Sequence, residues 1–119
     1  MVATLSESSD EERANIVAHT EDEYRLPNLA GIMPPEHLHP IVKLVLAGQL
    51  RNVTIYRGVP AGVTEIRPGD WVALTRNVAA NHTRGADGQV ISRRVPARDV
   101  AWAGTDENEY YYVPVQSAT

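Results

Sequence analysis

The hydrophobic pattern of the chain changes once, near residue 52, and this change limits the fold more than any other feature. Before that point apolar residues recur at helical spacing, and after it short β-branched and aromatic runs alternate with turn signals. Helices followed by strands, with one short helix between them, predict an α+β fold. At 119 residues the chain is long enough for one domain with one modest core. We therefore expect a single domain over 1–119, helical and acidic over 1–50 and β-rich over 51–119.

Two helices are expected in the first half. Ser9 is a good N-cap, and Glu12 completes a Ser-x-x-Glu capping box for a helix over 10–18. A second helix is predicted over 35–47, with Pro40 near its first turn as an alternative start. One apolar stripe and a terminal glycine support it: Leu38, Ile41, Val42, Val45, Leu46 and Gly48.

The second half predicts short strands separated by turns. Pro68-Gly69 is a turn signal with glycine free to adopt positive φ, and Asp87-Gly88 is a second one. Thr75 is expected to cap a short helix that runs through His82. The predicted strands cover 53–58, 71–74, 90–95, 100–102 and 109–113.

Composition excludes several classes of site. There is no cysteine, which removes disulfides, thiol nucleophiles and cysteine-based zinc sites. His37 and His39 are spaced so that they point apart on a helix, and no metal site is expected. The net charge of −4 is concentrated in residues 1–23, and the remaining body is too weakly basic to indicate nucleic acid binding.

No segment reads as a membrane span or a secretion signal. No apolar run approaches the roughly 20 residues of a spanning helix. Met1–Asp10 is polar and acidic, without a basic or apolar region of a signal peptide. We therefore expect a cytoplasmic protein, in its own cell, in a host cell or within a virion, and the sequence leaves its oligomeric state open.

Three segments at the ends of predicted strands carry residue types suited to one chemistry. They are Tyr56-Arg57-Gly58, Trp71-Val72-Ala73-Leu74-Thr75 and Glu107-Asn108-Glu109. In their order and strand placement they resemble the Arg–Ser/Thr–Glu branch of the ADP-ribosyltransferases, the cholera-toxin-like group. The resemblance covers 53–114, and it implies a small split mixed or antiparallel sheet that binds NAD between its halves.

The resemblance implies a role for each residue. Tyr56, Arg57 and Gly58 would bind NAD, with Thr75 contributing and also orienting the catalytic acid. Glu109 would be that acid, and Glu107 would activate or position a protein acceptor; in this family a glutamate there usually goes with an arginine acceptor. The residue types fit this chemistry, because cleavage of the nicotinamide–ribose bond passes through an oxocarbenium-like state that a fixed carboxylate stabilises.

Alternatives remain open at this point. NAD glycohydrolysis would use the same site with water as acceptor, and a non-catalytic interaction or virion-associated domain would keep the fold with a silent cleft. Thr75 alone reads equally as an N-cap, and Arg57 as an ion-pair partner at a sheet edge. Strand alternation predicts that Glu107 and Glu109 share one face, and the transferase reading requires Arg57, Thr75 and Glu109 to converge on one cleft.

Overall fold

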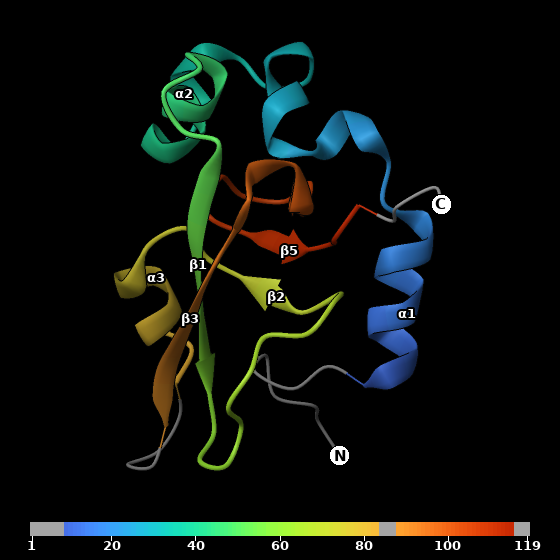
Figure 1. Cartoon of the computed structure of the whole chain (residues 1–119), viewed down its shortest axis with the longest axis vertical. Coiled ribbons are helices and arrows are strands. Elements are labelled where there is room, and N and C mark those ends of the chain that lie inside the picture. Colours follow the sequence, from blue (N-terminus) through green and yellow to red (C-terminus); the bar gives the residue numbers. More distant parts are fainter. Residues whose placement is uncertain (1–8, 84–87, 116–119) are drawn as a thin grey trace.

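The described part of the chain, residues 9–83 and 88–115 of a computed structural model, is an α+β fold (Figure 1). The α-helices are α1 (Asp10–His19), α2 (Pro40–Leu46) and α3 (Arg76–Ala80). The strands are β1 (Asn52–Val59), β2 (Trp71–Val72), β3 (Gln89–Pro96), β4 (Val100–Trp102) and β5 (Tyr110–Tyr112). Four 3-10 helices complete it: η1 (Asp22–Tyr24), η2 (Leu26–Gly31), η3 (Pro35–His37) and η4 (Ala97–Asp99).

The strands form two antiparallel sheets that meet at one point. One sheet is the long hairpin of β1 and β3, and the other has the order β2-β5-β4. An isolated bridge between Tyr56 and Ala73 joins the two sheets. This confirms the expected helices on a small split sheet, and all of its described pairings are antiparallel.

Local sequence signals explain where the helices begin. Ser9 Oγ accepts from the backbone N–H of Glu12 at 3.0 Å, so the predicted cap of α1 is confirmed. The second helix begins at Pro40, whose fixed φ suits a first helical turn, and His39 Nδ1 caps it by accepting from the backbone N–H of Ile41. The preceding prolines form only the short η3, so the longer predicted helix over 35–47 is corrected to its second half.

The core lies between the two sheets and extends beneath the N-terminal helical segments. In Figure 1, α2 and the 3-10 helices occupy one end of the sheets, α3 lies beside β1, and α1 stands at the opposite side near β5. α1 buries a single residue, and that residue is Arg13. The fully buried apolar residues include Leu26, Leu29, Val42, Ile55, Val59, Val72, Val100 and Tyr110.

The turn predicted at Pro68-Gly69 is confirmed, with Gly69 at φ +87°. A Cβ on Gly69 would lie 2.5 Å from the backbone oxygen of Arg13. Glycine is therefore required here twice, by the turn and by the close approach of α1. Asp87 of the other predicted turn lies outside the described residues.

Candidate active site

Two of the three predicted motif segments pair directly where β1, β2 and β5 adjoin, and the third leads into β5; we call this place the motif junction. Tyr56 and Ala73 exchange two backbone hydrogen bonds, of 2.9 and 2.8 Å. Val72, which precedes Ala73 and ends β2, pairs with Tyr110 of β5, and Tyr110 directly follows Glu109. Segments that are separated by up to fifty residues in sequence thus become neighbours in the sheets.

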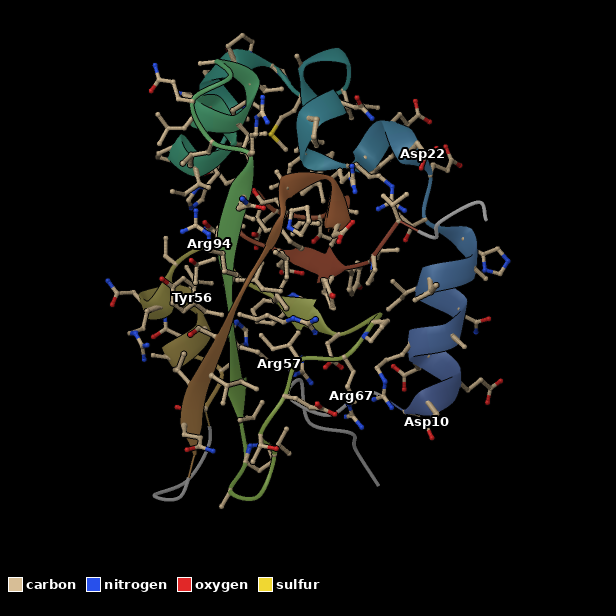
Figure 2. The ribbon with its side chains drawn as sticks, in the orientation of Figure 1. Asp10, Asp22, Tyr56, Arg57, Arg67 and Arg94 are labelled. Atoms are coloured by element: carbon tan, nitrogen blue, oxygen red, sulfur yellow. The ribbon has the colours of Figure 1, made fainter. Side chains whose placement is uncertain are left out.

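Arg57 and Tyr56 point to opposite sides of β1, as strand alternation requires. Figure 2 shows Tyr56 on the side of α3, whereas Arg57 extends toward Arg67 and Asp10. Directly paired residues of antiparallel strands share a face, so Ala73 lies with Tyr56. Arg57 therefore lies on the other face of the junction.

The Arg57 side chain is buried, with 2% of it exposed. Its Nη1 donates to the backbone oxygen of Trp71 at 2.8 Å, and its Nε lies 3.8 Å from Asp70 Oδ2. The guanidinium therefore ties β1 to the start of β2. The expected position in an open cleft is not observed, because Arg57 lies on the core-facing side of its strand.

Asp70 is a buried carboxylate that three arginines surround. Its Oδ2 accepts from the backbone N–H of Arg67 at 2.7 Å and lies 3.9 Å from Arg67 Nε, while Arg13 Nη1 lies 3.9 Å from Oδ1. No hydrogen bond within the described residues reaches Oδ1. Sequence reasoning missed Asp70, and its only signal was its position at the end of the Pro68-Gly69 turn.

Thr75 and Gly58 serve the packing of α3. Thr75 Oγ1 accepts from the backbone N–H of Val78 at 3.5 Å, which confirms the predicted cap. A Cβ on Gly58 would lie 2.4 Å from the backbone oxygen of Ala79. α3 therefore covers β1 at Gly58, and only a residue without a side chain permits this approach.

Glu109 is half-buried immediately before β5. Its carboxylate accepts from Thr105 Oγ1 at 2.9 Å, and its backbone oxygen accepts from Ala103 N–H at 2.9 Å. The hydroxyl that holds Glu109 therefore belongs to Thr105, whereas the resemblance assigned this task to Thr75. Glu109 is two residues before Tyr111, and its charge helps burial to raise the pKa of Tyr111.

The expectation that Glu107 and Glu109 share a face is wrong. Glu107 lies in a turn that precedes β5, so strand alternation does not apply to it. Its Oε2 is 3.9 Å from His37 Nδ1, and its backbone oxygen accepts from Tyr110 Oη at 2.6 Å. The two carboxylates therefore have different neighbours: Glu107 faces the helical half of the chain, and Glu109 faces Thr105.

The turn that carries both glutamates is held against Trp102. Trp102 Nε1 donates to the backbone oxygen of Asp106 at 2.9 Å. A cavity of about 580 Å³ lies on the Glu107 side, between this turn, Trp102, His37 and the apolar segment 32–34. A second cavity, of about 380 Å³, shares the Trp102 wall and lies against α1. Trp71 and Trp102 are both half-buried.

No protein-family model matches the chain, and no curated protein or solved structure is detectably similar to it. Residues 9–83 and 88–115 contain no group of three or more histidine or acidic side chains placed to hold a metal ion. Within the same ranges, none of the helices has the length and apolar character needed to cross a bilayer.

Proposed function

We propose that the protein transfers the ADP-ribosyl group of NAD to a side chain of an acceptor protein and releases nicotinamide. The observation that carries this proposal is the motif junction. Two of the three segments that resemble the motifs of the Arg–Ser/Thr–Glu ADP-ribosyltransferases pair there through Tyr56 and Ala73, and the third leads directly into β5, which pairs with β2 through Tyr110 and Val72. We further propose that the reaction takes place in the cytoplasm.

Glu109 is the catalytic carboxylate in this proposal. Cleavage of the bond between the nicotinamide nitrogen and ribose C1′ leaves positive charge on the sugar, and a fixed anion stabilises that charge. The hydrogen bond from Thr105 limits the rotamers of Glu109, and half-burial strengthens its field relative to a solvated carboxylate. The electron pair of the broken bond leaves with nicotinamide.

Glu107 serves the acceptor. Its carboxylate borders the cavity of about 580 Å³, whose apolar floor and half-buried tryptophan offer room for a protein side chain. A carboxylate there accepts the proton that the nucleophile loses as its new bond to C1′ forms. The separation of the two carboxylates in space agrees with separate tasks for them.

Arg57 acts as a positioning residue. A buried guanidinium that donates to Trp71 O and pairs with Asp70 fixes the relative place of β1 and β2. The NAD contact implied by the resemblance requires Arg57 to leave this pair. Tyr56, Gly58 and Thr75 border the same junction, and their contribution to NAD binding is part of the proposal.

A non-catalytic domain with the same fold is the second candidate, and the burial of Arg57 favours it. Calorimetric titration with NAD separates the candidates, since only the enzyme is expected to bind it.

The transferase is then tested by incubating the protein with biotin-labelled NAD and a cell lysate. We expect labelled acceptor bands together with free nicotinamide. Nicotinamide without labelled bands would indicate a hydrolase, and neither product would refute both enzymatic readings.

A further inference from the structure

The cavity of about 380 Å³ between α1 and β4–β5 is built largely from aromatic and aliphatic side chains. Tyr24 and Trp102 stack with 5.8 Å between ring centroids and 18° between ring planes. Tyr111 of β5 and Ile16 of α1 form further walls. All four side chains are half-buried, so they shape a cavity and still reach solvent. Its volume falls within the usual range of small-molecule sites.

Carboxylates outnumber basic side chains at and near this cavity. Glu21 is one of its lining residues, and the charges of Glu109 and Glu12 act on Tyr111, where they reinforce the rise in pKa caused by burial. Among the described residues that line it, none is a lysine or an arginine, and His19 is the one side chain of basic type. Aromatic faces carry negative potential, so the rings and the carboxylates here both favour a positively charged ligand.

We propose that this cavity binds a planar organic cation. Planarity suits a space bordered by the Tyr24–Trp102 stack, and positive charge suits the aromatic faces together with Glu21 and the carboxylates near Tyr111. Two groups share this chemistry: an N-alkylated pyridinium ring and a guanidinium group. The site stands on its own residues, most of which lie outside the three motif segments, and it does not depend on the proposed transferase activity.

The test compares charged and neutral ligands of one shape. We would titrate the full chain with 1-methylnicotinamide, with methylguanidine and, as the neutral parent ring, with nicotinamide. Calorimetry would measure the affinities, and NMR would follow the two indole N–H signals. The cations are expected to shift the signal of Trp102 and to leave that of Trp71, which packs on His82, unchanged. A Trp71→Phe variant assigns the signals. The cation that binds more tightly shows which group the cavity prefers, pyridinium or guanidinium.

Variants that add positive charge test the location. Glu21→Lys and Ile16→Lys are each expected to weaken cation binding at least about fivefold, because they place positive charge at the cavity. Glu65→Lys makes the same charge reversal as Glu21→Lys at an exposed position that does not line the cavity and is expected to leave binding unchanged. Since Glu21 and Glu65 are both exposed, neither change threatens folding.

Three results would overturn the proposal: equal affinity for nicotinamide and its methylated cation, absence of binding by both cations, or equal weakening by Glu21→Lys and Glu65→Lys. Nicotinamide release from NAD is measured on the same samples. Cation binding without NAD turnover would contradict the transferase and support the cavity. Turnover of NAD without a preference for cations would support the transferase and contradict the cation site. Failure of one proposal is therefore distinguishable from failure of the other.

Discussion

Arg57 and Asp70 form a buried ion pair in which Arg57 Nε lies 3.8 Å from Asp70 Oδ2, with at most 2% of either side chain exposed. Each comes from a different strand region, and the pair lies where α1 docks through Arg13. Removing one partner of a buried pair leaves the other charge without compensation, which costs far more than the loss of an exposed pair.

Asp70→Asn should therefore lower the free energy of unfolding by about 3–5 kcal/mol. The matched control is Asp22→Asn, because Asp22 pairs with Arg25 at 2.9 Å while its own side chain is 87% exposed. That change should cost at most about 1 kcal/mol. Urea unfolding of the two variants measures both values. Equal losses of free energy of unfolding would show that the buried pair of Asp70 contributes no more than an exposed pair.

Gly69→Ala should destabilise the protein more than Gly62→Ala. Both glycines have positive φ, +87° and +94°, so each alanine carries a backbone strain of about 1–2 kcal/mol. Only at position 69 would the new Cβ also overlap the backbone of Arg13, since nothing lies within 4 Å of a Cβ at position 62.

Hydrogen exchange distinguishes the clash from the strain in that pair of variants. The amides of α1 should lose protection in Gly69→Ala and retain it in Gly62→Ala, because only the former displaces the helix. Unchanged exchange of α1 in both variants would contradict the close packing at Gly69.

His39 makes stability depend on pH. Burial lowers the pKa of its imidazole from 6.5, and the charge of Glu107 opposes this shift. In the unfolded chain His39 therefore takes up a proton more readily than in the folded protein. The contribution of His39 to the free energy of unfolding should be at its full value above pH 6.5 and should fall as the solution is acidified below that pH. The neutral ring is also the form whose Nδ1 caps α2.

Urea unfolding at pH 7.5 and 5.5 checks this prediction. His39→Asn keeps a cap acceptor for the Ile41 N–H and should lose less stability between the two pH values than the parent does. Glu107→Gln removes the charge that opposes the shift, so this variant should lose more stability between the two pH values than the parent does. A His39→Asn variant as pH-sensitive as the parent would exclude His39 as the source.

The sequence predicted most of the fold because its signals are local. The Ser9 cap, the Thr75 cap, the Pro68-Gly69 turn and the β-branched runs each act within a few residues. The second helix was predicted too long, because Pro34-Pro35 and Pro40 permit only a 3-10 turn before α2.

The site was less predictable because its contacts are distant in sequence. Pairing of Tyr56 with Ala73 brings two motif segments together, but the expected cleft shared by Arg57, Thr75 and Glu109 is not observed. Arg57 lies on the face of β1 that Val53 and Ile55 bury in the core. Alternation failed for Glu107 because a turn, closed by Asp106 and Asn108, replaces the strand there. The aromatic cavity joins α1 to β5, and nothing local to either segment indicates it.

In the proposed reaction, Glu109 stabilises the charge that develops on the NAD ribose, while Glu107 serves the acceptor. Glu109→Gln keeps the size of the side chain and removes its charge, so nicotinamide release should fall by about 10²–10³-fold. Glu107→Gln should retain release to water and lose most acceptor labelling. Glu65→Gln, the same loss of charge at an exposed position that lines neither cavity, should change neither.

The direct measurement is nicotinamide release and acceptor labelling from one preparation each of the parent, Glu109→Gln, Glu107→Gln and Glu65→Gln. We expect Glu109→Gln to lose both activities and Glu107→Gln to lose labelling alone. Equal loss of both activities in the two glutamate variants would contradict the division of roles. A parent protein that releases no nicotinamide from NAD would contradict the function itself.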